Sequence, residues 1–163
     1  MSKELKTIIR QSVIAALYVA LTLAVSPIAY GAVQFRISEI LILLCFFRRD
    51  YIIGLSLGCA IANFFSPMPL TDVPFGTLAT LLSAFLISRS RNLFIASLYP
   101  VIANGFIIGL QLHFVFKEPL FFAMGYVALG EFVTVSVAGV VIFKMLSKSK
   151  AFLELIEAEQ NLD

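Results

Sequence analysis

Residues 30–39 of this chain read YGAVQFRISE and separate the first two of a series of hydrophobic runs. The stretch gathers Gln34, Arg36, Ser38 and Glu39 between segments that carry few polar side chains. Polar residues at such a place predict a loop at which a membrane protein meets water. Because the flanking segments are apolar, this loop is also where a small polar molecule would be held.

The composition of the whole chain indicates a membrane protein. Of its 163 residues, 60% are hydrophobic and only 13% are charged, and the mean hydropathy is +0.98. A soluble domain has a smaller hydrophobic excess and roughly twice the share of charged residues. We therefore predict one all-α integral membrane domain that covers residues 1–163.

Six hydrophobic segments, bounded by charges or turn-forming residues, predict six transmembrane helices. A spanning helix needs about 20 residues, and the first, fifth and sixth segments meet this length. The second and fourth are short, and the second and third could alternatively form a re-entrant pair. The segments are 11–29, 37–48, 50–65, 74–88, 93–114 and 120–146, followed by a cytoplasmic tail at 147–163.

The distribution of cations predicts the orientation of these six segments. With the N-terminus inside, every Lys and Arg except Arg36 and Lys117 falls on the inner side, which leaves ten of the twelve there. Cytoplasmic segments carry such an excess of Lys and Arg. A miscounted segment would place the later cations on the other side, so we expect both termini in the cytoplasm.

Several polar side chains on different predicted helices lie at comparable depth. Counted at 1.5 Å per helical residue, Asn63, Asn104 and Glu131 each lie roughly 20 Å from the cations at the inner ends of their helices. Such a level, in the outer half of the membrane, predicts a pocket that opens to the outside. The candidate substrate-binding residues are Gln34, Arg36, Glu39, Asn63, Asp72, Asn104 and Glu131.

Most of these residues also have an ordinary structural explanation. The two asparagines could hydrogen-bond between helices, Asp72 could cap a helix, and Glu39 could pair with Arg36 at the surface. Glu131 is the strongest candidate, because an ionisable group at that depth is costly and usually functional.

The chemistry of the candidates predicts the kind of ligand. Carboxylates and amides suit a ligand that donates hydrogen bonds or carries positive charge, and one carboxylate can accept two N–H bonds from a guanine-like edge. Tyr30 and Phe35 offer aromatic surface for a ring. The outer position of the loop that carries them and its density of polar groups predict a lid over the ligand, in which Gly31 permits the backbone turn. His113 is the only histidine, and we predict no metal site, no catalytic residues and no bound cofactor.

A strip of small residues follows the first predicted helix at every fourth position: Ser12, Ala16, Ala20 and Ala24. Such a strip allows close approach of another helix, and it predicts a docking face for a separate membrane subunit. A similar strip, Gly54, Gly58 and Ala62, has packing within this protein as its first explanation. The chain has no phosphate-binding GxxxxGK[ST] loop, so uphill transport would need energy from elsewhere.

Four motifs, taken in order, resemble one known family. They are YGAVQFRISE at 30–39, AN…SP at 62–67, DVPFGTLAT at 72–80 and NG at 104–105. This pattern is similar to the QueT family, whose members are substrate-binding (S) components of energy-coupling-factor transporters. The resemblance covers most of residues 10–146.

This resemblance implies a six-helix S-component bundle in the prokaryotic plasma membrane. It implies a 7-deazaguanine ligand, such as queuine or its aminomethyl precursor, and no nucleic acid. It further implies a transmembrane coupling subunit that contacts the first helix, and two partner ATPases that use the ATP. The alternatives are an S component for another vitamin or nucleobase-like solute, a stand-alone transporter or channel, and a membrane-embedded enzyme with Glu39, Asp72 or Glu131 as acid or base.

Overall fold

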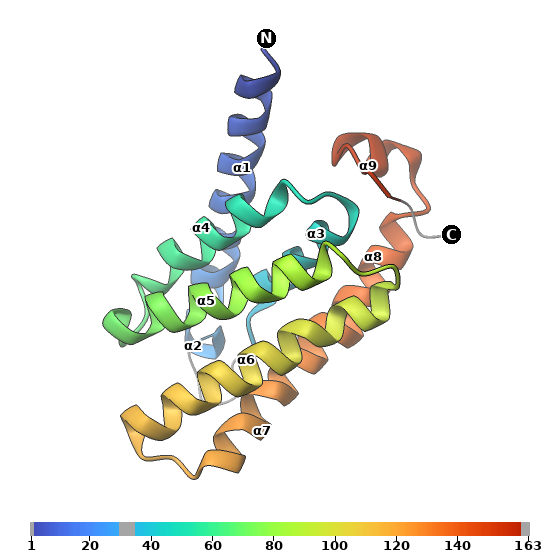
Figure 1. Cartoon of the computed structure of the whole chain (residues 1–163). Coiled ribbons are helices and arrows are strands. Elements are labelled where there is room, and N and C mark those ends of the chain that lie inside the picture. The colour runs from blue at the N-terminus through green and yellow to red at the C-terminus, as the bar shows by residue number, and fades with distance from the viewer. Residues whose placement is uncertain (1, 30–34, 161–163) are drawn as a thin grey trace.

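The computed structural model of the chain describes residues 2–29 and 35–160 (Figure 1). Within these ranges every regular element is a helix and no strand occurs, which confirms the all-α prediction. The elements, in chain order, are α1 (Lys3–Ala24), α2 (Ser26–Ala29), the 3₁₀ helix η1 (Ile37–Leu43), α3 (Leu44–Phe47), α4 (Tyr51–Asn63), α5 (Pro69–Ile87), α6 (Leu93–Phe116), α7 (Leu120–Glu131), the π-helix η2 (Phe132–Gly139), α8 (Val140–Leu146) and α9 (Lys150–Leu155).

Four described helical stretches are long and apolar enough to cross a membrane. They are Glu4–Ala24, Pro69–Ile87, Leu93–Phe116 and Leu120–Leu146. Two shorter apolar helices cover Ile37–Phe47 and Tyr51–Asn63. Large apolar side chains remain exposed on the outer faces of the bundle, including Ile61, Ile102 and Phe106, as expected where lipid replaces water as the solvent.

The boundaries of two helices differ from those predicted. α1 begins at Lys3 rather than near residue 11, because its polar first turns continue the helix behind an N-cap made by Ser2. α5 begins at Pro69 rather than near 74, because Pro69 occupies the first helical position, where its missing N–H costs nothing. Pro74 therefore lies inside α5 rather than at its start.

The second predicted segment extends further than an α-helix with the same number of residues, because part of it is a 3₁₀ helix. η1 contributes seven residues of 3₁₀ helix and α3 four residues of α-helix. Because a 3₁₀ helix rises about 2.0 Å per residue against about 1.5 Å in an α-helix, these residues extend over roughly 20 Å rather than roughly 16 Å. η1 lies at the centre of the fold, in contact with α1, α4, α5, α6 and η2, so Ser38, Glu39, Ile42 and Leu43 are completely buried.

The two faces of α1 have different surroundings. Its inner face packs against α4, where a Cβ at Gly54 would meet Gln11 at 2.6 Å and one at Gly58 would meet Tyr18 at 2.9 Å. The glycines of this α4 strip therefore allow close packing within the protein, as predicted from the sequence. The small-residue strip on the opposite side of α1 is exposed along its whole length, at Ser12, Ala16, Ala20 and Ala24.

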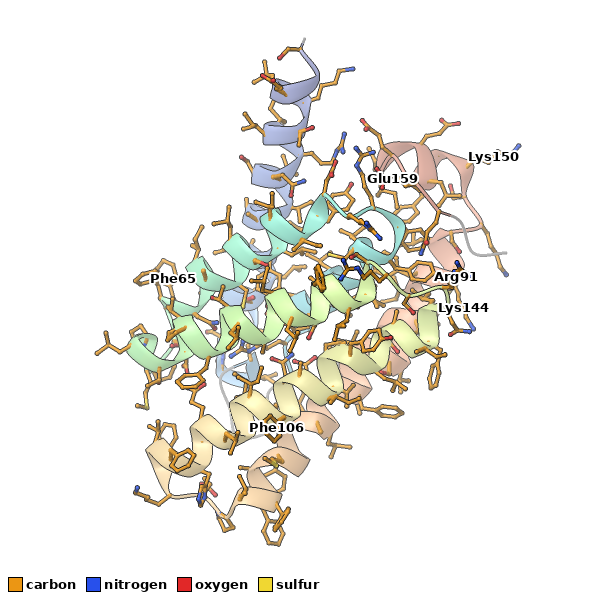
Figure 2. The ribbon with its side chains drawn as sticks, viewed as in Figure 1. Phe65, Arg91, Phe106, Lys144, Lys150 and Glu159 are labelled. Carbon is orange, nitrogen blue, oxygen red and sulfur yellow. The ribbon has the colours of Figure 1, made fainter. Side chains whose placement is uncertain are left out.

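Cations gather at one end of the bundle. Figure 2 shows Arg91, Lys144 and Lys150 toward this end, whereas Phe65 lies at the opposite end. The predicted tail contains the helix α9, which folds back onto this end. The hydroxyl of Tyr51 donates to the carbonyl oxygen of Ile156 at 3.1 Å.

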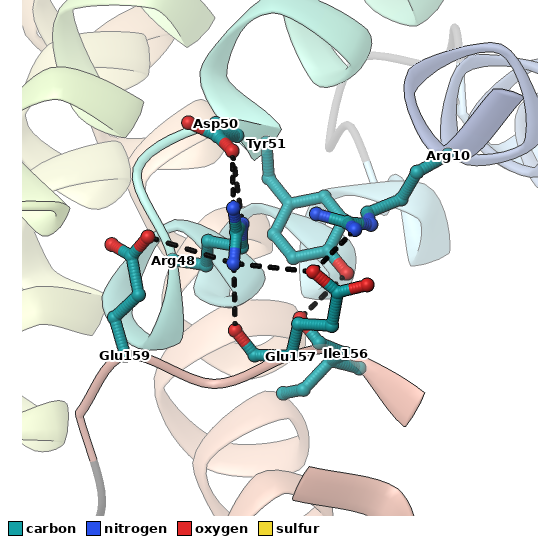
Figure 3. A network of polar contacts seen from close by, with 7 residues as sticks. All are labelled: Arg10, Arg48, Asp50, Tyr51, Ile156, Glu157 and Glu159. Atoms are coloured by element: carbon teal, nitrogen blue, oxygen red, sulfur yellow. Dashed lines mark hydrogen bonds and ion pairs between the residues drawn. The ribbon is translucent and has the colours of Figure 1, made fainter. Parts of the chain in front are cut away.

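Ion pairs hold the segment after α9 in place (Figure 3). Arg48 Nη2 lies 2.7 Å from Asp50, and Arg48 Nη1 lies 3.4 Å from Glu157 and 3.6 Å from Glu159. Partial burial acts to lower the pKa of Arg48, but these three carboxylates outweigh it and raise that pKa above its ordinary value. Arg10 of α1 also contacts Glu157, at 2.6 Å, so the tail ties α1 to the α3–α4 turn.

Candidate functional site

A buried polar cluster lies inside the bundle, where η1 meets α1, α4, α5 and the α6–α7 pair. Buried polar side chains are costly unless they are hydrogen-bonded. The hydrogen bonds of each member therefore separate side chains that link helices from those that a ligand could contact. Its members are Tyr18, Thr22, Arg36, Ser38, Glu39, Cys59, Asn63, Thr80, Asn104, Gln111 and Glu131.

Hydroxyl groups of α1 hold Glu39 and its neighbour Ser38 in place. The Tyr18 hydroxyl donates to Oε1 of Glu39. The hydroxyl of Thr22 donates to the Tyr18 carbonyl oxygen at 2.9 Å and lies 2.7 Å from the hydroxyl of Ser38. Oε2 of Glu39 has no hydrogen-bond partner among the described residues. The carboxylate is thus fixed in position through Oε1, and the Thr80 side chain also lies close to it.

Arg36 lies just before η1 and turns inward. Its side chain is 4% exposed, and Nε donates to the carbonyl oxygen of Ala29 at 3.3 Å. The guanidinium also interacts electrostatically with Glu39 and Glu131. A pairing of Arg36 with Glu39 at the surface is therefore wrong, because both residues are buried.

Asn63 acts mainly as a link between α4 and α5. Its Nδ2 donates to the carbonyl oxygen of Asp72 at 3.0 Å and to Sγ of Cys59 at 3.4 Å. A Cβ at Gly76 would collide with this amide and would lie 3.8 Å from Nη1 of Arg36. Glycine at position 76 therefore makes room for the amide beside the guanidinium.

Asp72 lies in the first turn of α5 but does not cap it, because the helix already starts at Pro69. An acidic side chain in a first turn is favoured by the helix dipole. Its Oδ1 accepts a hydrogen bond from Nε2 of Gln111 on α6. Gln111 is buried, was not among the predicted site residues, and keeps Oε1 without a partner among the described residues.

α6 runs antiparallel to α7 and η2 in close contact (Figure 1). The close packing uses glycines of α6, since a Cβ at Gly105 would lie 3.0 Å from the Cβ of Ala128. Three facing pairs fix the register: Ser97 with Ser136, Gly105 with Ala128, and Gly109 with Met124.

Asn104 and Glu131 lie on these two facing helices and are 3% and 2% exposed. Nδ2 of Asn104 and Oε2 of Glu131 have no hydrogen-bond partner among the described residues. Glu131 is the last residue of α7, directly before the π-helix η2. π-Helical turns inside α-helices are frequent at functional sites.

The structure thus brings together most of the predicted site. Arg36, Glu39, Asn63, Asn104 and Glu131 are buried in one region, and Asp72 borders it. Six further members of the cluster were not among the predicted binding residues, namely Tyr18, Thr22, Ser38, Cys59, Thr80 and Gln111. The sequence offers one signal for them, which is a polar residue at a position on the buried face of its helix.

Other predicted residues lie elsewhere or outside the described ranges. Tyr30, Gly31 and Gln34 belong to residues that the structure does not describe, so the lid stays a prediction. Phe35, at the edge of that gap, is half-buried. Over residues 2–29 and 35–160, no group of three His, Cys, Asp or Glu side chains is placed to hold a metal ion.

The unpaired atoms define what the cluster can bind. Three acceptors lack a partner within the described part of the chain, namely Glu39 Oε2, Gln111 Oε1 and Glu131 Oε2, against one amide donor, Asn104 Nδ2. Leaving such a buried atom unpaired costs about 1–3 kcal/mol. A solute with several N–H donors and a carbonyl is chemically complementary to these atoms.

Comparisons with known proteins show the family of the chain. Residues 8–148 match the model of a family described as QueT transporter. The chain is also 35% identical over 163 residues to the queuosine precursor transporter QueT of Lactococcus lactis subsp. cremoris (strain MG1363). That alignment covers 88% of this chain and 95% of the relative. No solved structure matches the chain.

Proposed function

The chain belongs to the QueT family of transporters, and we propose that it is the substrate-binding subunit of an energy-coupling-factor importer for a queuosine precursor. It is a multi-pass protein of the cell membrane. In the proposed cycle it captures a 7-deazaguanine from outside, and partner ATPases supply the energy. No cofactor binds to this chain itself.

One observation carries the substrate proposal: buried, unpaired acceptors outnumber unpaired donors in the cluster. A 7-deazaguanine presents several N–H donors beside a single ring carbonyl, which is the complementary set. Glu39, Asn104 and Glu131 would contact the ligand, with Arg36 balancing part of their charge. Asn63 and Asp72 would shape the site through their bonds between helices.

The proposed topology has six crossings with both termini in the cytoplasm. Two shorter apolar helices support it, because η1 with α3 and α4 would each add one pass to the four longer spans. The cations at the end that carries α9 support the inward placement of that end. Labelling of single cysteines introduced in the turns, in a variant without Cys45 and Cys59, tests this topology.

The small-residue strip of α1 supports the proposed partnership. An exposed line of Ser and Ala on a membrane helix permits close backbone contact with a second helix. The strip is exposed among the described residues, and α1 contacts α4 with its other face. We propose that the coupling subunit docks there and that two ATPase subunits join through it.

Equilibrium binding to the purified protein tests the substrate. Queuine, its aminomethyl precursor and guanine are compared, together with thiamine and riboflavin as ring-bearing vitamins. Tight binding of a 7-deazaguanine alone supports the proposal, whereas tight binding of another vitamin alone refutes the queuosine assignment. Co-purification of the tagged chain with a membrane subunit and two ATPases tests the assembly, and uptake without them would contradict it.

A further inference from the structure

Ser97, Asn104 and Gln111 form a polar stripe along α6, because positions seven residues apart share one face of a helix. The side chains of the outer two members already have partners. The Ser97 hydroxyl donates to the carbonyl oxygen of Phe94 at 2.7 Å, and Gln111 donates to Asp72. The middle member, Asn104, has no described partner for its Nδ2. The Asn104 amide therefore differs from the polar side chains of both neighbours.

The register of α6 against α7 brings Asn104 close to the level of Glu131. Since Gly105 faces Ala128, the two residues are offset by only two positions, or about 3 Å along the helix axis. Both side chains are buried, and one offers an unpaired donor while the other offers an unpaired acceptor. They do not hydrogen-bond to each other, so Nδ2 of Asn104 and Oε2 of Glu131 can each meet a third group.

We infer that Asn104 and Glu131 act as one pair that binds the lactam edge of the ligand ring. Nδ2 of Asn104 donates to the ring carbonyl, and Glu131 accepts from the adjacent ring N–H and the exocyclic amine. This pair is specific for a ring in which a carbonyl stands next to an N–H. The inference rests on the proposed function and goes further, because it says which atoms of the ring are read.

A matched pair of ligands tests this inference on the wild-type protein. The first is 7-aminomethyl-7-deazaguanine, and the second is its analogue with an amino group in place of the ring carbonyl. In the analogue a donor faces the donor of Asn104, and a ring nitrogen without hydrogen faces Glu131. We expect the analogue to bind at least about tenfold more weakly, since sites that hydrogen-bond a group discriminate strongly against its loss.

Two variants then test which side chains cause the preference for the lactam over its analogue. Asn104→Leu and Glu131→Gln should each weaken binding of the lactam by about tenfold or more and reduce its advantage over the analogue. The double variant should lose less than the two single losses combined, because both side chains read one edge. Glu118→Gln, the same type of change in an exposed carboxylate, is the matched control and should leave both affinities unchanged.

The possible results separate the two proposals. Equal wild-type affinity for the two ligands overturns the lactam pair while leaving the queuosine assignment standing. Variants that keep the full discrimination also overturn the pair. Failure of the wild type to bind either ligand overturns the proposed function together with the inference. The wild-type comparison needs no variant, so it remains decisive even where a substitution prevents folding.

Discussion

The hydroxyl of Tyr18 on α1 donates a hydrogen bond to the carboxylate of Glu39 on η1, and both side chains are almost completely buried. The same helix exposes Ala16 and Ala20 on its opposite face. α1 thus lies between the buried polar cluster and the proposed docking face. A movement of α1 relative to η1 would change the position of Glu39 directly.

Tyr18→Phe should destabilise the protein and weaken ligand binding. The change removes the donor to Glu39 Oε1 and leaves a buried carboxylate with one fewer partner, which costs about 1–3 kcal/mol of unfolding free energy. We expect ligand affinity to fall by up to about tenfold. Thermal unfolding in detergent and equilibrium binding measure the two effects. Tyr126→Phe, at an exposed tyrosine, is the control, and equal behaviour of the two variants would contradict the role of Tyr18.

Glu39→Gln and Asp72→Asn should differ in their effects on binding. Glu39 keeps an oxygen for the ligand, so its amide variant should bind about ten- to a few-hundredfold more weakly. Asp72 is bound by Gln111, and asparagine retains the oxygen that accepts this bond. We expect a change of less than about threefold for Asp72→Asn. The reverse order of effects, measured by equilibrium binding, would assign the ligand contact to Asp72 instead.

Ala16→Trp and Ala20→Trp should abolish uptake in cells while leaving ligand affinity nearly unchanged. A bulky side chain on the exposed strip would keep a partner helix at a distance, and neither position contributes to the inner face of α1. Ile102→Trp, at an exposed position on α6, is the control for a new indole facing lipid. Normal uptake by both alanine variants would refute docking at this strip.

Glu157→Ala should loosen the tail without unfolding the bundle. The side chain pairs with Arg10 and Arg48 but is about half exposed, so the loss of stability should stay below about 1 kcal/mol. Trypsin should cut faster at Lys148 or Lys150 in this variant, and high salt should speed cleavage of the wild type through screening. Glu154→Ala changes an exposed carboxylate that makes no ion pair among the described residues and should leave the cleavage rate unchanged.

Much of the helical layout could be predicted because hydrophobic runs and their boundaries are local signals. All six predicted segments are helical over most of their length. The winding of residues 37–43 could not be predicted, because an apolar run has the same appearance in a 3₁₀ and an α-helix. The π-helical winding of η2 could not be predicted for the same reason. η2 packs against α6 and η1, which are distant from it along the chain.

In the candidate site, the buried polar residues could be predicted but their hydrogen-bond partners could not. Glu39, Asn104 and Glu131 were predicted because polar residues are rare in apolar segments, and all three are buried as expected. The partners of these residues were harder to predict. The bond from Tyr18 to Glu39 depends on how α1 packs against η1, and the bond from Gln111 to Asp72 depends on the α5–α6 contact. Neither contact follows from spacing along the chain.

The 3₁₀ helix η1 has a consequence for biosynthesis. In the proposed topology, η1 and α3 must enter the bilayer together with the polar side chains of Ser38 and Glu39, and an ionisable group inside the membrane is costly. So short a segment has little apolar surface to offset this cost by itself. It therefore should leave the translocon together with α4 as a helical hairpin and settle against an α1 that is already inserted. Truncated nascent chains that end before α4 should fail to integrate residues 37–47.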